Sequence, residues 1–190
     1  RLVVVMPPVQ LDSNVPWLAS GGNPNLRAMY DGMISINVMD GSFEPRLATD
    51  WSMSADGKAW TFKLAEGVDF HNGWGEFTAK DVIHDWQMDT SEDSITTGAT
   101  TFKEIIDSEA SFDIVSDHEI VFNLNTPWPD LIPMMVDVEE DWLVSSKNHF
   151  DAEGQDGMLA SPAGTGAWRQ TDRLISYFAI YERVENHWRK

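Results

Sequence analysis

Hydrophobic and polar positions alternate along several short stretches of this chain, which predicts β-strands separated by helices and turns. The earliest apolar stretch, Leu2–Met6, is followed by two prolines and predicts a buried strand. Asp40-Gly41 and Asp56-Gly57 each stand between alternating stretches and predict tight hairpins. Further strands are predicted at 60–64, 112–115, 120–124 and 174–184, with a strand end at 144–146.

Apolar residues at helical spacing predict a second kind of element between these strands. Thr78 is suited to cap a helix that runs to about Thr90, because Asp81 three residues later favours the first turn. Shorter helices are predicted at 25–34, 101–107 and 127–135, and irregular loops at 10–23 and 150–164. This mixture of hairpins and helices predicts an α/β or α+β fold with a mixed β-sheet.

Length and composition indicate one substantial globular domain, or a domain with a subdomain. The chain has 190 residues, of which 42% are hydrophobic, and it contains nine tryptophans. Its first apolar run is far shorter than the ~20 residues that span a bilayer, and no signal-peptide pattern precedes it. We therefore expect a mature or trimmed chain that does not itself span a membrane. There are no cysteines, which excludes disulfides and thiolate chemistry.

Charge excludes one class of partner. The formal net charge is −18, and residues 104–168 carry 14 Asp and Glu residues against a single Lys or Arg, Lys147. Such a surface repels phosphate backbones, so we expect no nucleic-acid partner. The acidic region is expected to be a solvated face that keeps the protein soluble. An interaction domain that binds a basic partner is the alternative.

Catalytic and metal-binding patterns are missing from the sequence. The histidines at 71, 84, 118, 149 and 187 never fall at zinc-ligand spacing. Gly164-Thr165-Gly166 is only half of a dinucleotide-binding motif, and no GxSxG is present. Glu139-Glu140-Asp141 offers paired carboxylates, but consecutive acids usually point in different directions. We expect no enzyme activity, no metal and no cofactor.

One stretch, TFKLAEGVDFHNG at 61–73, contains two short strand-like pieces and a polar His71-Asn72-Gly73 tip. The tip is compatible with a metal loop, a catalytic loop or a plain turn. Gly73 is suited to the left-handed backbone that a turn requires. We favour the structural turn.

An ordered series of motifs resembles one protein family. The motifs are YDGMI at 30–34, GSFEPRLATDW at 41–51, DGKAWTFKL at 56–64, GVDFHNG at 67–73 and FTAKDV at 77–82. They resemble the family 5 extracellular solute-binding proteins of ABC transporters, the dipeptide, oligopeptide and nickel-binding class. PAGTGAW at 162–168 is similar to the family's P-x-G-T-G-P-Y, with Ala167 and Trp168 replacing Pro and Tyr. ENHW at 185–188 is similar to its R-N-x-x-Y-W.

This resemblance implies a periplasmic-binding-protein type II lobe I, with a mixed β-sheet and an accessory α+β subdomain. Family members are longer and close two lobes on the ligand, so this chain is expected to stop before lobe II. The implied division is 1–38 for the start of the ligand-facing subdomain, 39–163 for the accessory subdomain and return segments, and 164–190 for the return toward the hinge.

Candidate ligand contacts follow from strand ends and from side-chain chemistry. The loop after Leu2–Met6 is the first candidate, because α/β clefts form at strand ends; it offers Asn14 and Trp17. The segment after the 127–135 helix offers Glu139, Asp141 and Trp142. The loop that resembles G-T-G offers Thr165 and Gly166. For each of these residues a purely structural role is the alternative.

The resemblance implies a binding protein that captures a small polar solute and delivers it to ABC permease subunits. A short peptide is favoured over an oligosaccharide, because the acidic second segment suits an amino-bearing ligand. A glycan-binding module, suggested by the tryptophans, is the rival function. Trp51, Trp60 and Trp86 weaken this rival, because they fall within the motifs expected to form the core. The expected location is periplasmic or extracellular, with a lipoprotein anchor as an option for the full-length protein.

Overall fold

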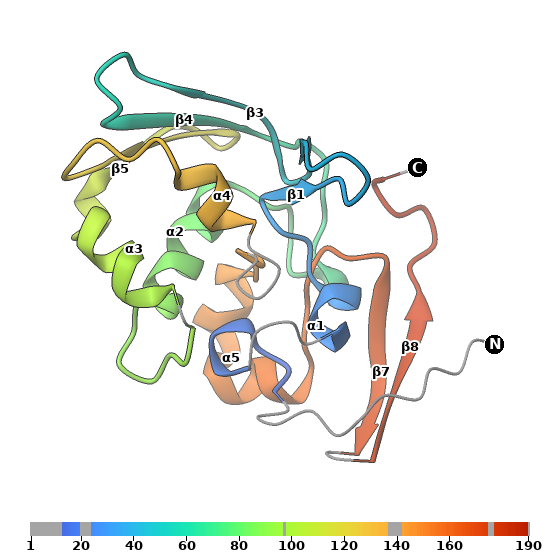
Figure 1. Cartoon of the computed structure of the whole chain (residues 1–190). Helices are drawn as coiled ribbons and strands as arrows, with labels where there is room; N and C mark the ends of the chain where they lie inside the picture. The colour runs from blue at the N-terminus through green and yellow to red at the C-terminus, as the bar shows by residue number, and fades with distance from the viewer. Residues whose placement is uncertain (1–12, 20–23, 97, 137–141, 175–176, 190) are drawn as a thin grey trace.

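The computed structural model describes residues 13–19, 24–96, 98–136, 142–174 and 177–189. The predicted strand Leu2–Met6 lies outside these residues. Within them, the strands form three separate sheets and the helices pack mainly on one side of the largest sheet (Figure 1). Every strand pairing of these three sheets is antiparallel.

Both predicted Asp-Gly hairpins are confirmed. The first joins β1 (Ile34–Ile36) to β2 (Phe43–Pro45), and the second joins β3 (Ala48–Met53) to β4 (Ala59–Leu64). In each turn the glycine adopts a left-handed backbone, with φ of 75° at Gly41 and 72° at Gly57. Only glycine adopts this conformation at no steric cost, which is why the sequence signal was reliable here.

The largest sheet has the strand order β3-β4-β6-β5, with β5 at Phe112–Ser116 and β6 at Glu119–Asn123. Alternate residues of the two central strands point into the core, so Phe62 of β4 and Ile120 of β6 are fully buried opposite each other. The rings of Phe62 and Phe122 lie 4.8 Å apart. This face forms the floor of the main hydrophobic core.

Three helices cover that floor: α2 (Ala79–Asp89), α3 (Ala99–Ile105) and α4 (Leu131–Met135). The short 3-10 turn η3 (Glu109–Ser111) precedes β5 and has no buried residue. The predicted cap of α2 is confirmed as a capping box, in which the backbone N–H of Thr78 donates to Asp81 over 2.8 Å. The other oxygen of Asp81 accepts from the backbone of Lys147 at 2.9 Å. One carboxylate therefore starts α2 and also fixes the entry of the next long helix.

That next helix corrects the prediction of a loop at 150–164. Residues Lys147–Ala160 form α5, and Ser146 caps its N-terminus with a side chain that accepts a hydrogen bond from the backbone N–H of His149. The buried side chains of His149 and Met158 hold the helix to the body. Gly154 interrupts it with a φ of 64°, so two short helical pieces follow one another. The polar, glycine-rich sequence shows no apolar residues at helical spacing over either piece, because each piece buries only a narrow face.

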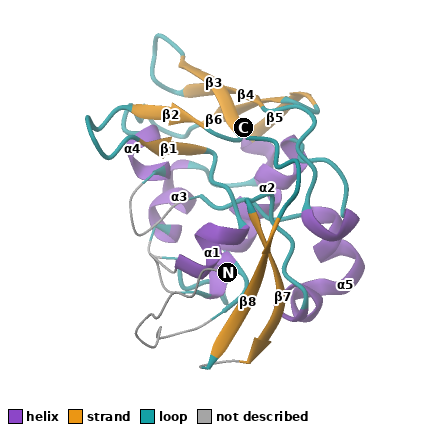
Figure 2. Cartoon of the chain, turned by 90° about the vertical axis from the view of Figure 1, so that its right-hand side faces the viewer, coloured by secondary structure: helices purple, strands orange, loops and turns teal. Residues whose placement is uncertain are grey.

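The C-terminal strands also differ from the prediction. The long strand expected at 174–184 is instead the second arm of a ribbon between β7 (Trp168–Leu174) and β8 (Phe178–Arg183). The strand end expected at 144–146 is absent, and only an isolated bridge between Gly32 and Leu143 occurs there. Figure 2 shows the ribbon extending away from the four-stranded sheet.

The N-terminal elements join this ribbon to the body. They comprise η1 (Pro16–Leu18) and α1 (Pro24–Met29), the latter shorter than the helix predicted at 25–34. Leu26, Met29 and Tyr30 form a small buried cluster against which Tyr181 of β8 packs. Val15, Trp17 and Met158 form another cluster beneath α5. These residues connect chain segments that lie more than a hundred positions apart.

Candidate functional site

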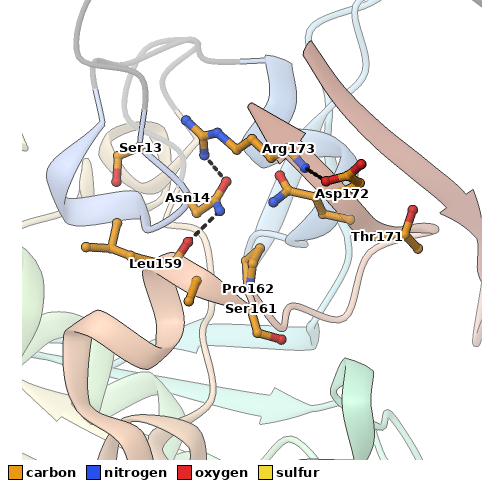
Figure 3. Close-up of a pocket in the computed structure, with 10 residues that line it drawn as sticks. Ser13, Asn14, Leu159, Ser161, Pro162, Thr171, Asp172 and Arg173 are labelled. Carbon is orange, nitrogen blue, oxygen red and sulfur yellow. Dashed lines mark hydrogen bonds between the residues drawn. The ribbon is translucent and has the colours of Figure 1, made fainter. Parts of the chain in front are cut away.

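A pocket of about 440 Å³ opens where the N-terminal loop, the end of α5 and β7 meet (Figure 3). Its lining combines polar side chains with a short apolar rim and comes from three distant segments. The lining residues are Ser13, Asn14, Leu159, Ala160, Ser161, Pro162, Gln170, Thr171, Asp172 and Arg173. The pocket volume lies within the range of small-molecule sites.

Asn14 connects all three walls of this pocket. Its amide nitrogen donates to the carbonyl oxygen of Leu159 at 2.7 Å, at the end of α5. Its side-chain oxygen accepts from the guanidinium of Arg173 on β7. The hydroxyl of Tyr30 donates to its backbone carbonyl at 2.9 Å. Asn14 is only 3% exposed, so its amide is held in one orientation and fixes Arg173 at the pocket wall.

Charges of both signs meet at β7. The pairing of β7 with β8 shifts register between Gln170 and Asp172, which is how consecutive residues reach the same pocket. Asp172 accepts from the backbone N–H of Arg173 at 2.8 Å. The side-chain oxygen of Gln170 is buried and accepts no hydrogen bond within the described part of the chain. The pocket therefore offers a carboxylate and a guanidinium to a polar solute.

A second polar centre lies around Asp31, at the opposite end of β7. This carboxylate is 1% exposed and accepts from Arg189 at 2.7 Å, Trp188 at 3.1 Å and Thr165 at 3.2 Å. Arg46 lies 3.4 Å from it. The Asp31 junction, meaning Asp31 with the four residues that bond it, thus joins the motifs at 30–34, 41–51, 162–168 and 185–188.

Glycines in the loop before β7 allow its close approach to α1. A Cβ atom on Gly164 would stand 2.1 Å from the carbonyl oxygen of Met29, and one on Gly166 would stand 2.6 Å from that of Ala28. The backbone N–H of Gly166 donates to Met29 O at 2.8 Å. Backbone contact this tight leaves no room for a side chain.

His71 holds the same loop from the other side, which answers the question raised by the His-Asn-Gly tip. Its backbone N–H donates to Gly164 O at 2.9 Å, and its Nε2 lies 2.8 Å from Gly166 O. Burial lowers the pKa of His71, so the ring is neutral at pH 7. The predicted turn is confirmed as η2 (His71–Gly73), with left-handed backbone at Asn72 and Gly73.

The predicted ligand contacts fall in different places. Asn14 lines the pocket, whereas Thr165 and Gly166 are buried in the loop between α1 and the Asp31 junction. Trp17 is 1% exposed and donates to Gln155, and Trp142 is 2% exposed inside the main core. Neither indole faces the pocket. Glu139 and Asp141 lie outside the described residues.

Sequence reasoning missed Gln170, Asp172 and Arg173. The stretch WRQTDRL at 168–174 has neither apolar alternation nor a motif spacing, so no signal marked it as a strand or as a pocket wall. Asp31 did carry a signal, because it stands within the YDGMI motif. Its partners at 165, 188 and 189 are too far along the chain for any local pattern to reveal.

Buried acids elsewhere serve the fold. Asp85 on α2 accepts from the backbone N–H of Ser145 at 3.0 Å and from its hydroxyl at 2.6 Å, and burial raises its pKa well above the usual range. Burial likewise raises the pKa of Asp89 to about 7. Within the described residues, no group of three or more His, Asp or Glu side chains is placed to hold a metal ion. None of the described helices is both long and apolar enough to span a membrane.

Comparison with known sequences identifies the family. The profile of the family described as "Bacterial extracellular solute-binding proteins, family 5 Middle" matches residues 42–190. The nickel-binding periplasmic protein of Escherichia coli (strain K12) is 28% identical over 163 residues, which cover 84% of this chain and 29% of that protein. Heme-binding protein A of Haemophilus influenzae is 27% identical over 188 residues, which cover 88% of this chain and 33% of that protein.

Solved structures agree with this result. A dipeptide-binding protein from Pseudoalteromonas sp. SM9913, in complex with Met-Leu, superposes with a TM-score of 0.80 at 25% identity, covering 96% of this chain and 39% of that chain. The periplasmic binding protein DppA of Helicobacter pylori, in complex with the peptide STSA, gives a TM-score of 0.78 at 26% identity, covering 95% and 38%. These are binding proteins by name, and the predicted type II lobe is confirmed. This chain spans about a third of the length of the curated relatives. The chain belongs to the bacterial extracellular solute-binding proteins of family 5.

Proposed function

We propose that this chain forms most of the first lobe of the substrate-binding component of an ABC importer. It captures a small polar solute outside the cytoplasmic membrane and delivers it to the permease, without catalysis. The pocket between Asn14, the end of α5 and β7 is one wall of the ligand cleft. The remaining length of a protein of this family would supply the opposite wall.

A short peptide is the ligand that the pocket fits best. A peptide has an ammonium and a carboxylate, and the pocket offers Asp172 and Arg173 in turn. The observation that carries this proposal is the orientation of Arg173 by the buried side chain of Asn14. A guanidinium held in one direction selects for the planar carboxylate geometry that it matches. Two solved relatives that hold peptides support the same choice.

The subdomain limits 1–38, 39–163 and 164–190 stay part of this proposal, although the main core also takes Met33 and Ile34 from the first segment and the pocket takes residues 159–162 from the second. The main core draws on residues from Met33 to Val144, whereas the pocket draws on residues 13–14 and 159–173. Thr165 and Gly166 contribute by placing the start of β7. An oligosaccharide is the alternative ligand. Aromatic or polar side chains on the opposite wall of the cleft, outside this chain, would favour a sugar over a peptide.

A thermal-shift screen of the full-length protein tests the proposal. Di- to pentapeptides and oligosaccharides are compared, and a ligand at about 100 times its Kd adds roughly 2.7 kcal/mol of stability. We expect peptides to raise the melting temperature and oligosaccharides to leave it unchanged. Stabilisation by oligosaccharides alone would overturn the peptide assignment.

Two variants then locate the site. Arg173→Met and Asn14→Ala should weaken the binding of the peptide found in the screen by about tenfold or more. Arg169→Met is the matched control, because Arg169 lies on the same strand but is exposed and pairs with Glu182 at 3.4 Å. Equal effects of Arg169→Met and Arg173→Met would show that the pocket is not the binding site.

A further inference from the structure

Helix α5 is broken into two pieces at Gly154. The backbone there has a φ of 64° and a ψ of −171°, a combination that is essentially open to glycine alone. A second glycine makes the break compact, because a Cβ atom on Gly157 would stand 2.2 Å from the Cβ of Glu153. Two glycines thus allow the second piece, residues 155–160, to pack directly against the end of the first.

The first piece is fixed to the main body. The backbone N–H of Lys147 donates to Asp81 of α2 at 2.9 Å, and the side-chain amide of Asn148 donates to Trp74 O at 3.0 Å. The ring of His149 stacks on that of Trp74, with 4.3 Å between the centroids. All of these contacts lie before the break, so they hold the first piece and leave the second to other partners.

The second piece is fixed to the N-terminal loop instead. The indole N–H of Trp17 donates to the side-chain oxygen of Gln155 at 3.0 Å. The amide of Asn14 donates to Leu159 O at 2.7 Å (Figure 3). Met158 is fully buried and packs in one cluster with Trp17. The second piece and the loop therefore form one unit.

Trp17 also contacts the other side of the break. Its indole meets the rings of His84 on α2 and Phe150 on the first piece edge to face, with centroid separations of 6.1 Å and 6.2 Å. The same indole bonds the second piece through its N–H. One side chain thus touches the body and both pieces of α5, and so fixes the angle between the two pieces.

This angle decides where the pocket wall lies. Leu159 and Ala160, at the end of the second piece, line the pocket. Leu159 O also holds the amide of Asn14, and the oxygen of that amide accepts from Arg173. A change of angle at the break therefore reaches the guanidinium through two hydrogen bonds.

We propose that Gly154 and Trp17 are positioning residues for solute binding: the glycine permits the break in α5, and the indole sets its angle through Gln155. They act on the solute through Asn14 and Arg173 and do not touch it. The inference rests on the function proposed above, because it concerns the same pocket. It gives Trp17 a role in binding other than the direct contact expected from the sequence.

Hydrogen exchange of the full-length protein tests the joint at Gly154 without any solute. In Gln155→Leu the indole N–H loses its acceptor, so the amides of residues 155–160 should exchange about threefold to tenfold faster. Those of residues 147–153 should change by less than about twofold, because they belong to a different local unit. Gln155→Glu keeps an oxygen acceptor and should restore the wild-type exchange. Equal acceleration of both pieces in Gln155→Leu, or of neither, would overturn the inference.

Calorimetric titration with the di- to pentapeptides of the thermal-shift screen measures the effect on the pocket. Gly154→Ala should raise the Kd by about tenfold or more, because an L side chain forces the break out of its present backbone. Gly67→Ala is the matched control, since Gly67 has a φ of 69° and, like Gly154, free space around an added Cβ atom. It lies outside the pocket lining and should leave the Kd within about twofold. Equal rises in both glycine variants would mean that strain alone weakens binding, against the inference.

A double-mutant cycle assigns the effect to the pair. Trp17→Phe and Gln155→Leu remove the two ends of one hydrogen bond, so the double variant should bind peptide about as weakly as the weaker single variant. Rises in Kd that multiply would show that the two residues act independently, and the inference would be wrong. If no peptide binds the wild-type protein, the proposed function fails, and the exchange measurement alone decides whether Trp17 and Gln155 hold the joint.

Discussion

The indole nitrogen of Trp188 donates to the carboxylate of Asp31 over 3.1 Å, although 157 positions separate the two residues. Arg189 binds the other oxygen of the same carboxylate at 2.7 Å. The last described residues are therefore anchored to one of the first motifs of the chain. This anchor fixes the position of Trp188 and Arg189 on the body.

Replacing Asp31 with Asn should destabilise the protein strongly. The amide removes the negative charge and turns one acceptor into a donor that faces Trp188 and Thr165. Breaking a buried charged centre in this way costs about 3 kcal/mol. Urea unfolding at pH 7 measures the loss. Asp50→Asn is the control, because Asp50 pairs with Lys63 on the exposed surface at 3.4 Å, and such pairs contribute little. Similar losses in both variants would argue against the anchor.

Gly164→Ala should prevent the loop before β7 from seating against α1. The new methyl group would stand 2.1 Å from the carbonyl oxygen of Met29, so the backbone must move. We expect a loss of about 2 kcal/mol or more in the free energy of unfolding. Gly32→Ala serves as the comparison, because its methyl group would meet Trp142 O at an ordinary 3.4 Å. A stable Gly164→Ala protein with unchanged melting would contradict the close packing.

The raised pKa of Asp89 predicts a loss of stability with rising pH. Burial raises its pKa to about 7, whereas the carboxyl of an unfolded chain titrates near 4. Between these two pKa values the folded state holds a proton on Asp89 that the unfolded state releases. The contribution of protonated Asp89 to the free energy of unfolding is therefore full below pH 4 and is lost as pH rises through 7. Asp89→Asn should stabilise the protein at pH 8 by on the order of 2 kcal/mol.

Unfolding at pH 4 and pH 8 checks this prediction. The two proteins should be equally stable at pH 4, where both side chains are neutral. Asp93→Asn is the control, since Asp93 is exposed on the loop that follows α2. If the advantage of Asp89→Asn were the same at both pH values, proton binding by Asp89 would not be its cause.

His84 should act in the opposite direction. Burial lowers its pKa to about 4, and its Nε2 has no hydrogen-bond partner within the described residues. Its stabilising contribution is therefore full above pH 6.5 and is lost as pH falls toward 4. His84→Leu should reduce the loss of stability between pH 7 and pH 4 by roughly 3 kcal/mol. The half-buried His118, replaced by Gln, provides the reference. An unchanged pH profile in His84→Leu would exclude a neutral buried imidazole.

Local patterns predicted those elements whose cause is local. The hairpins at Gly41 and Gly57 and the capping box at Thr78 each depend on residues within four positions, and all three were correct. Helix α5 was missed because Gly154 breaks its periodicity and its stability comes from contacts made by His149 and Met158. Strand β7 was missed because its residues are mostly polar.

The site was harder to predict than the fold. Asn14 was identified from its position after an expected strand, but its partner Arg173 lies 159 residues away. Trp17 and Trp142 were chosen for their aromatic surface, which the structure buries. A single sequence reveals which side chains are capable of binding but not which of them remain accessible, because accessibility depends on packing between distant segments.

The contact between His71 and Gly166 determines which ring nitrogen carries the proton. A carbonyl oxygen only accepts, so Nε2 must donate, and the unprotonated Nδ1 has no partner among the described residues. Burial lowers the pKa of this ring. An imidazole in this state resists a second proton, so the joint between the body and the ribbon stays in a single protonation state when its surroundings turn mildly acidic. The geometry of the pocket wall beside this joint thereby stays constant over a mildly acidic range.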